Sequence, residues 1–534
     1  MPPRRAPLLL GLAATAVGAA VAFGLLRGPA PVEPDGRPNF LIIDIDTLRA
    51  DRVGATRGGV AVTPNLDALS ARSARFTHAY SQSGWTMPAL VSNLTGTLPV
   101  VFSKVEGQVS WRPPNARDLP EILGLYGYTT IAFWGNTIPG MMSGAVSDTF
   151  QVAKRVEGSF APAPPTHEVI AFLEQAPKEP FFAYVHEIDL HNPQSFLAGP
   201  EGIPFDHPAM PKDEPFYRNA YTQVLKTSGE AAARDAMTSR YDGVLHLYDR
   251  AIGRVLAVLE ERGLADHTVV VVTADHGEDF FEHSVMEHGL LHDTTLHVPL
   301  IVYDPTGSAR TVDTMVQSVD LAPTVLARAG VPIDRTMDGR SLLDLIGVPG
   351  VAVSGGAAPA ESYVERPVFS LSEPCHVSLR TRTHKLILRD KRPPTHVMRP
   401  AGGGNAVIVP LSTFAAAHGP DLPLADCSSM RVLGTAGQPE ARGPSPDELV
   451  LELYDLVADP TEQINLVAEQ PEVAAGLLAP LLHTVASRRE AVAGATPSAM
   501  TPEQIKALKD NGYWELVQPG SAPSTPSGAP SAAP

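Results

Sequence analysis

Three short, strongly apolar runs constrain the fold of this chain more than any other feature. They are NFLIIDI (39–45), FFAYVHEI (181–188) and TVVVVTA (268–274), and polar or charged residues follow each of them at once. Such runs are typical of strands buried on both faces of a parallel sheet. Between the second and third runs, residues 241–263 carry apolar side chains at helical spacing and end on Gly263, a stop signal. This alternation predicts an α/β fold with a doubly wound, mostly parallel sheet, which binds ligands at the carboxyl ends of its strands.

The later part of the chain predicts a smaller unit of different construction. Residues 368–390 and 451–456 have the pattern of strands in an antiparallel sheet, and residues 472–492 that of an amphipathic helix. Residues 350–366 and 400–445 are rich in Gly, Ala and Pro, which favours loops or insertions.

We therefore expect four regions along the chain. A catalytic domain occupies residues 38–348, and a C-terminal subdomain with loop insertions occupies residues 349–495. Residues 519–534 consist almost entirely of Pro, Ser and Ala, a composition typical of a disordered tail. Residues 1–28 form a signal peptide or an N-terminal membrane anchor.

The N-terminal prediction depends on an uncharged stretch. Arg4 and Arg5 precede residues 6–26, which carry no charge and are long enough to cross a membrane as a helix. Small residues at 19–22 leave open a cleaved signal peptide. Either alternative places the rest of the chain on the outer side of the cytoplasmic membrane, in the periplasm or outside the cell, anchored or secreted.

Charge and cysteine content exclude other classes. The formal net charge of −17 argues against a nucleic-acid partner, because phosphate binding needs a basic face. Cys375 and Cys427 lack metal-ligand spacing, which leaves a structural pair or two inert thiols. The sequence does not indicate the oligomeric state.

Ionisable side chains follow each of the three predicted strands. The carboxyl ends of parallel strands meet at one edge of a sheet, so these side chains should lie close together. Carboxylates with an imidazole bind hard-to-borderline divalent cations, and the further Asp and His allow a second cation. One Asp after a strand is more often a helix cap, but three such clusters favour a site. The residues are Asp46 after the first run, His186, Asp189 and His191 in the second cluster, and Asp275 and His276 in the third.

Several ordered segments together resemble the sulfatase family of the alkaline phosphatase superfamily, over most of residues 38–490. The resemblance lies in IDTLRADRVG (45–54), TPNLDALSARSARFTHAYSQ (63–82), YDGVLHLYDRAIGRVL (241–256), VVVVTADHGEDFFEH (269–283), HVPLIVYDP (297–305), SVDLAPTVLARAGVP (318–332), DGRSLLDL (338–345) and LYDLVADPTEQINL (453–466).

The resemblance implies a divalent metal ion, calcium or zinc, and specific residues around it. Asp46, Asp275 and His276 match the family's metal ligands, and Asp189 is a candidate ligand of a second metal. Thr86 occupies the nucleophile position of the Cys/Ser-x-Pro-x-Arg signature. His191 and His288 match histidines that contact the substrate or the transferred group, and are candidate catalytic residues that stabilise that group or protonate the leaving oxygen. His186 and His283 are at least as well explained as packing or supporting residues.

Three positions depart from the family pattern. Thr86 replaces the cysteine or serine that matures to formylglycine, and threonine cannot form that aldehyde, so no formylglycine is expected. Leu90 replaces the signature arginine, and Thr47 replaces the second aspartate of the usual pair. Lys104 is a candidate replacement cation.

Thr86 remains a candidate nucleophile, because related phosphotransferases and phosphodiesterases use a threonine next to a metal ion. Pro88 suits a first helical turn, and Thr86 then lies where a helix cap presents its oxygen; a simple cap is the alternative role. The sequence predicts an exported, metal-dependent hydrolase that cleaves a sulfuric or phosphoric ester of a small molecule, glycan or lipid. A phosphoryl-group transferase and a catalytically silent, sulfatase-like binding protein are the alternatives.

Overall fold

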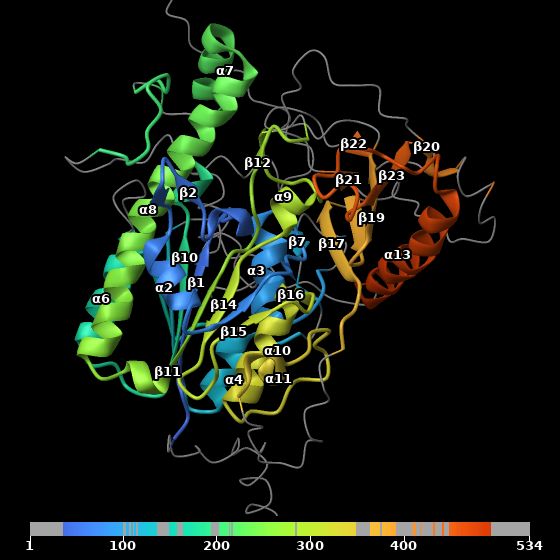
Figure 1. Ribbon diagram of the computed structural model, residues 1–534. Coiled ribbons are helices and arrows are strands. Elements are labelled where there is room, and N and C mark those ends of the chain that lie inside the picture. Colours follow the sequence, from blue (N-terminus) through green and yellow to red (C-terminus); the bar gives the residue numbers. More distant parts are fainter. Residues whose placement is uncertain are drawn as a thin grey trace, which may run out of the picture.

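The computed structural model covers both predicted units of the chain (Figure 1). It describes residues 36–99, 103–105, 108–110, 112–113, 116–135, 149–156, 164–193, 202–212, 214, 217–283, 286–348, 364–373, 376–390, 409–412, 417, 431–432, 441–442 and 448–492. Within these ranges, no helix combines the length and the apolar character needed to cross a membrane. The predicted export segment, the predicted tail, Cys375 and Cys427 lie outside the described residues.

An eight-stranded sheet forms the centre of the larger unit. Neighbouring strands are parallel except at β14, which runs antiparallel to both of its neighbours, so the predicted α/β, mostly parallel sheet is confirmed. The strand order is β15 (Arg310–Val312), β4 (Ala74–Phe76), β14 (Leu300–Tyr303), β11 (Thr268–Thr273), β1 (Asn39–Ile45), β10 (Phe181–Glu187), β8 (Thr129–Trp134) and β9 (Val152–Arg155).

Helices cover both faces of this sheet (Figure 1). Side chains alternate between the faces of a strand. Leu41 and Ile43 of β1 pack in one core, whereas Phe40 and Ile42 pack in the other. The first core includes residues of α2 (Pro64–Ser70), α6 (Pro164–Glu174), α7 (Tyr217–Ser228) and α8 (Glu230–Glu261). The second includes residues of α3 (Thr86–Thr95), α4 (Leu119–Leu125), α10 (Leu321–Arg328) and α11 (Leu343–Ile346).

Helix α8 corresponds to the helix predicted over residues 241–263, but it begins earlier, at Glu230. Its end agrees with the prediction: Gly263 follows with a φ of +70°, a conformation that glycine adopts without strain.

The smaller unit is an antiparallel sheet with one long helix, as predicted. The helix α13 (Pro471–Val492) packs its apolar side chains, including Leu478 and Leu482, against the sheet core. The strand order is β17 (Val368–Glu373), β18 (His376–Arg380), β19 (His384–Asp390), β23 (Leu449–Asp455) and β20 (Val409–Pro410). The exact boundary between the two units stays a prediction.

Short elements connect these layers. They are η1 (Ala50–Arg52), β2 (Thr56–Arg57), β3 (Val60–Ala61), β5 (Ala79–Tyr80), β6 (Ser103–Val105), β7 (Gln108–Ser110), η2 (Asp189–His191), η3 (Ala265–His267), β12 (Asp279–Phe280), β13 (Met286–Glu287), α9 (Asp293–Leu296), β16 (Val316–Gln317), η4 (Ser318–Asp320), β21 (Arg431–Val432) and β22 (Ala441–Arg442).

Polar contacts join the smaller sheet to the segment that leads into α3. The backbone N–H of Leu371 donates to the carbonyl of Gln82 at 2.8 Å, and the Ser370 hydroxyl donates to the carbonyl of Ser81 at 2.8 Å. The Ser81 hydroxyl in turn donates to the carbonyl of Asp275 at 2.5 Å. The smaller sheet therefore holds the loop from which the Thr86 helix begins.

Candidate active site and metal centre

Two aspartates at the carboxyl end of β1 form the first part of the site. Asp44 lies within the strand and Asp46 directly follows it, so both side chains point to the face covered by α3, and both are fully buried. The next residue, Thr47, has a φ of +62°, an uncommon conformation for a β-branched residue. Its hydroxyl donates to the carbonyl of Asp46 at 2.6 Å, which fixes the turn at the strand end. Strained backbone of this kind clusters at functional sites.

Strand register brings the remaining ligands to the same place. His186 of β10 pairs with Asp44, and Thr273 of β11 pairs with Asp44 on the other side, so Asp275 follows two residues beyond on the same face. The Nε2 atom of His276 lies 3.5 Å from Oδ1 of Asp46 and 3.4 Å from Oδ2 of Asp275. The structure thus brings together the three predicted ligands Asp46, Asp275 and His276 as one fully buried group.

Thr86 contacts this group from α3. Its Oγ1 lies 3.3 Å from Nε2 of His276. Thr86 is the first helical residue, and Trp85 is the N-cap without a side-chain capping bond, so the alternative role of Thr86 as a helix cap is wrong. The α3 helix therefore directs its N-terminal partial positive charge toward the region next to the Thr86 hydroxyl.

The buried carboxylates lack positive partners of fixed charge. In the part of the chain that the structure describes, the ion pairs of Asp46 and Asp275 are with histidines. Burial and the nearby Asp275 charge raise the pKa of Asp46 well above its usual value. Burial works against the charged form of Asp275 too, but His276 and His186 hold its pKa below the usual range. Burial lowers the pKa of His276 to about 4, so its ring is neutral at pH 7.

These residues fit a divalent cation. Both carboxylate oxygens of Asp46 and Oδ2 of Asp275 are buried and accept no hydrogen bond from the described residues. Oδ1 of Asp275 is fixed by the backbone N–H of His276 at 2.8 Å. Nδ1 of His276 is 2.8 Å from the carbonyl of Gly277, which leaves Nε2 as the ligand atom. Two charged oxygens and a neutral imidazole nitrogen that face one another form a metal donor set.

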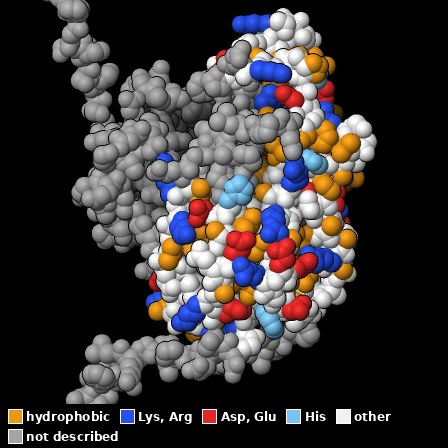
Figure 2. All heavy atoms as spheres, turned by 90° about the vertical axis from the view of Figure 1, so that its left-hand side faces the viewer, with side chains coloured by type: hydrophobic (Ala, Val, Ile, Leu, Met, Phe, Trp, Pro, Cys, Tyr) orange, Lys and Arg blue, Asp and Glu red, His pale blue; other side chains and the backbone are white. Residues whose placement is uncertain are grey.

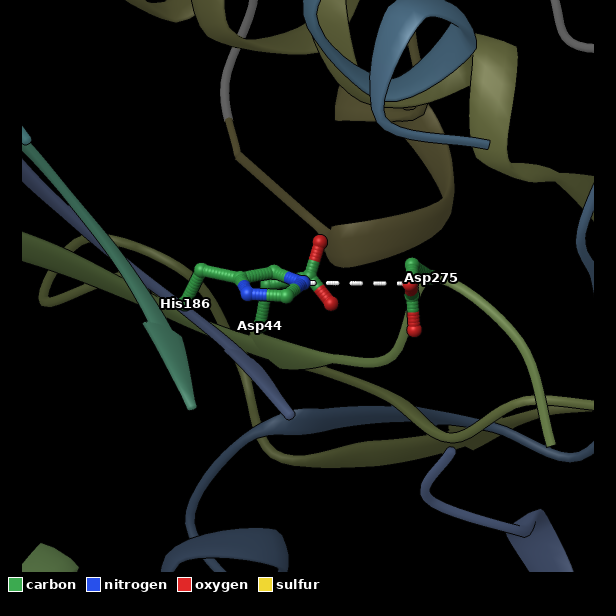
Figure 3. A group of neighbouring side chains, drawn as sticks. All are labelled: Asp44, His186 and Asp275. Carbon is green, nitrogen blue, oxygen red and sulfur yellow. Dashed lines mark ion pairs between the residues drawn. The ribbon is translucent and has the colours of Figure 1, made fainter. Parts of the chain in front are cut away.

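Asp44 belongs to the site, although it was not among the ligands predicted from the sequence. Tyr184 donates to its Oδ2, and Asn93 of α3 donates to the same oxygen at 3.1 Å. Burial and the Asp275 charge raise the pKa of Asp44 to about 6. Figure 3 shows its carboxylate beside the ring of His186, with Asp275 opposite. The signal was present in the sequence: Asp44 is charged inside an apolar strand and lies two residues before Asp46, hence on the same face.

Two histidines and an acidic residue lie next to the buried Asp/His group. The rings of His191 and His288 meet edge to face with their centroids 4.7 Å apart, and the His288 ring lies 4.5 Å from the His276 ring. Nδ1 of His288 is 3.6 Å from Oε2 of Glu278, which is buried. His191 and His288 are thus close enough to act on one substrate group. Asp189 begins η2, and its side chain lies outside the described residues.

The other predicted positions lie elsewhere. His283 contacts Asp279 at 2.6 Å and the carbonyl of Thr461 at 3.0 Å, and stacks on His292, so it packs against the loop after β23. Leu90 is fully buried in the core of the α3 face. Lys104 is in β6, and its side chain lies outside the described residues.

The side of the molecule formed by α6 and α8 carries interspersed acidic and basic side chains (Figure 2). The ion pairs of α8 include Asp235 with Arg57 of β2 at 2.9 Å and Arg254 with Glu261 at 2.7 Å. Helices α6 and α8 cover one face of the large sheet, whereas α3, which carries Thr86, covers the other.

Known families match the chain over the same region. The Sulfatase family matches residues 38–331, and N-sulphoglucosamine sulphohydrolase, C-terminal, matches residues 281–391. The chain is 26% identical to an uncharacterized sulfatase of Escherichia coli (strain K12), YidJ, over 59% of this chain and 73% of that protein. It is 25% identical to arylsulfatase A of Homo sapiens, over 65% of this chain and 73% of that protein.

Solved structures share the fold. A 2-O GAG sulfatase superposes with a TM-score of 0.58 at 19% identity, over 88% of this chain and 96% of that chain. A phosphonate monoester hydrolase of Agrobacterium radiobacter superposes with a TM-score of 0.55 at 19% identity, over 85% of this chain and 96% of that chain. The family match over residues 38–331 shows that the chain belongs to the sulfatase family and is an ester hydrolase, and the solved structures show the same fold.

Proposed function

We propose that this chain is an exported, metal-dependent hydrolase that cleaves its ester through Thr86. The observation that carries the proposal is the position of the Thr86 hydroxyl, 3.3 Å from Nε2 of His276 and at the first residue of α3. A nucleophile at this place faces the metal-binding carboxylates on one side and the helix N-terminus on the other. The same position in the family's signature holds the residue that attacks the ester.

Residues of the chain orient the attacking hydroxyl and donate a proton to the leaving group. A divalent cation bound by Asp46, Asp275 and His276 would supply positive charge that lowers the pKa of the Thr86 hydroxyl and neutralises charge on the ester. The Thr86 hydroxyl gives up its proton to water, Oγ1 forms a bond to sulfur or phosphorus, and the bond from that atom to the departing oxygen breaks in line with the attack. His191 or His288 donates a proton to that oxygen, and water then releases the group from Thr86.

Anion binding must work without the signature arginine, because Leu90 is in the core. The N-terminus of α3 provides backbone N–H groups and partial positive charge at the transferred group. His191 and His288 supply further hydrogen-bond donors on the facing side. This set favours a group with one negative charge, such as a sulfate ester or a phosphate diester, over a doubly charged phosphate monoester.

The substrate class and location extend the same proposal. One structural neighbour is named as a 2-O GAG sulfatase and another as a phosphonate monoester hydrolase. We therefore include glycan, lipid and small-molecule esters as substrates. The uncharged N-terminal stretch supports export and a place outside the cytoplasmic membrane, in the periplasm or beyond.

The test is turnover of an aryl sulfate, a phosphate monoester and a phosphate diester by the metal-loaded protein. The Thr86→Ala variant is compared with Thr95→Ala, a threonine at the other end of the same helix whose hydroxyl donates to the carbonyl of Val91. We expect Thr86→Ala to abolish turnover and Thr95→Ala to retain it. Equal turnover by wild type and Thr86→Ala would refute the nucleophile. Bound metal without turnover of any ester would favour the silent binding protein instead.

A further inference from the structure

His186 is a buried imidazole without a hydrogen-bond partner in the described part of the chain. Its side chain is fully buried, and neither Nδ1 nor Nε2 makes a hydrogen bond there. The ring nevertheless points at carboxylates: Nε2 lies 3.7 Å from Oδ2 of Asp275 (Figure 3). The same nitrogen lies 3.9 Å from Oδ2 of Asp46. A buried polar ring normally makes a hydrogen bond, so the lack of one at His186 among the described residues needs an explanation.

Asp46 and Asp275 lie between two imidazoles. Oδ1 of Asp46 lies 3.5 Å from Nε2 of His276, and its Oδ2 lies 3.9 Å from Nε2 of His186. Oδ2 of Asp275 lies within 3.7 Å of both nitrogens. Carboxylates that face a separate imidazole on each side have the arrangement of bridging ligands in two-metal sites, where the ions lie about 3.5–4 Å apart.

Asp44 completes a second donor set beside the first. One ligand atom from each of Asp44, His186 and Asp275 lies within 4.8 Å of the others, and all three side chains are buried. Tyr184 and Asn93 both donate to Oδ2 of Asp44, which leaves Oδ1 without a partner among the described residues. Such supporting hydrogen bonds fix the orientation of a ligating carboxylate.

The charge of the buried group can accommodate more than one cation. Asp44, Asp46 and Asp275 place three carboxylates in one fully buried group, and no lysine or arginine of the described residues pairs with them. One divalent ion leaves a net negative charge in a region that excludes water. Buried charges persist only when they are paired or coordinated.

We propose that Asp44, His186 and Asp275 hold a second divalent cation, of borderline type such as Zn²⁺ or Mn²⁺, with Asp275 shared between the two ions. The imidazole ligand favours these ions over Mg²⁺ or Ca²⁺. The inference rests on the proposed metal at Asp46, Asp275 and His276. It differs from the sequence-based expectation, in which Asp189 served a second metal. Asp44 lies within β1, two residues before Asp46, so an ion at this site would orient Asp275 from the side of the strand.

The experiment measures metal content without reference to turnover. Metal-free full-length protein is loaded with Zn²⁺ or Mn²⁺, dialysed, and analysed for metal per chain by mass spectrometry. We expect about two ions per chain for the wild type and about one for His186→Gln and for Asp44→Asn. His292→Gln is the matched control, since His292 is another buried histidine, near Tyr454, and should retain two. In the Mn²⁺-loaded wild type, electron paramagnetic resonance should show an exchange-coupled pair that both site variants lose.

The outcomes separate this inference from the proposed function. One ion per chain in the wild type and in both variants, with Thr86-dependent turnover, would overturn the second site and leave the function intact. Two ions without turnover would support the second site and count against the hydrolase mechanism. Circular dichroism identifies a variant that fails to fold. If one of His186→Gln and Asp44→Asn does not fold, the metal content of the other tests the second site.

Discussion

The hydroxyl oxygen of Thr86 lies 3.3 Å from Nε2 of His276, although the two residues are 190 positions apart in the chain. The contact joins the first residue of α3 to the loop after β11. It places the candidate nucleophile beside the buried carboxylates that are the candidate metal ligands. The proposed mechanism therefore depends on packing between a helix and a strand end.

The first prediction concerns the hydroxyl itself. Thr86→Ser keeps the oxygen and removes a methyl group, so we expect turnover within about tenfold of wild type. Thr86→Val keeps the shape and removes the oxygen, and we expect a loss of about 10³-fold or more in kcat. Steady-state kinetics on the best ester of the panel measure both. A Val variant as active as the Ser variant would show that another group attacks.

The second prediction links metal and activity. Asp275→Asn removes the charge of the carboxylate shared by both proposed metal sites, so metal content and turnover should fall together to background. Asp266→Asn in η3 is the control, because that carboxylate is exposed and precedes β11, at the opposite end of the strand from the ligand set. Elemental analysis and kinetics are run on the same samples. Retention of either property in Asp275→Asn contradicts the ligand assignment.

The third prediction concerns the junction between the two sheets. Lys385 of β19 is fully buried and pairs with Asp293 of α9 and, at 2.7 Å, with Glu462. Lys385→Met keeps the apolar stem but removes the ion-pair partner of the buried Glu462, whereas Asp293 keeps its pair with Arg380 at 3.0 Å; we expect a loss of about 3–5 kcal/mol in the free energy of unfolding. Urea unfolding measures it. Arg254→Ala, which breaks an exposed pair with Glu261, should cost less than about 1 kcal/mol.

The fourth prediction is a pH dependence of stability. Burial, and then the charge of Arg389, lower the pKa of His376 to about 3, against 6.5 in the unfolded chain. Between these values the unfolded state binds a proton that the folded state excludes, so stability falls as the pH falls from 6.5 toward 3.

From pH 7 to pH 5 this one histidine should remove about 2 kcal/mol from the free energy of unfolding. His376→Gln does not titrate, so the wild type should lose that much more than the variant over the same interval. Urea titrations at the two pH values give the difference. Parallel losses in both proteins would mean that His376 is protonated in the folded state.

The fifth prediction tests whether the family's arginine could be restored. Leu90 is fully buried in the core beneath α3. Leu90→Arg would place a charge there, so we expect destabilisation of more than about 3 kcal/mol and no gain in turnover. Thermal unfolding and kinetics check this, with Leu90→Met as the conservative control. A stable and more active Arg variant would show that position 90 reaches the anion.

The sequence by itself determined the architecture and the ligand candidates. Buried parallel strands have continuous apolar runs, so the composition of residues 39–45, 181–188 and 268–274 was enough to predict the central strands. Ionisable residues directly follow such strands, which made Asp46, Asp275 and His276 ligand candidates, and the structure brings these three together. The ordered family segments made Thr86 the candidate nucleophile.

Only the tertiary structure decided the roles of residues whose side chains contact residues far away in the sequence. Asp44 looks like an isolated charge in a strand until the register with β10 places His186 beside it. The sequence leaves the role of His283 open, and its contact with the carbonyl of Thr461 places it against the loop after β23. In the sequence, Leu90 stands where the family has an anion-binding arginine, and the structure shows that its side chain packs in the core. Local patterns fix strand and helix type, whereas side-chain partners follow from register and packing, which connect residues far apart in the sequence.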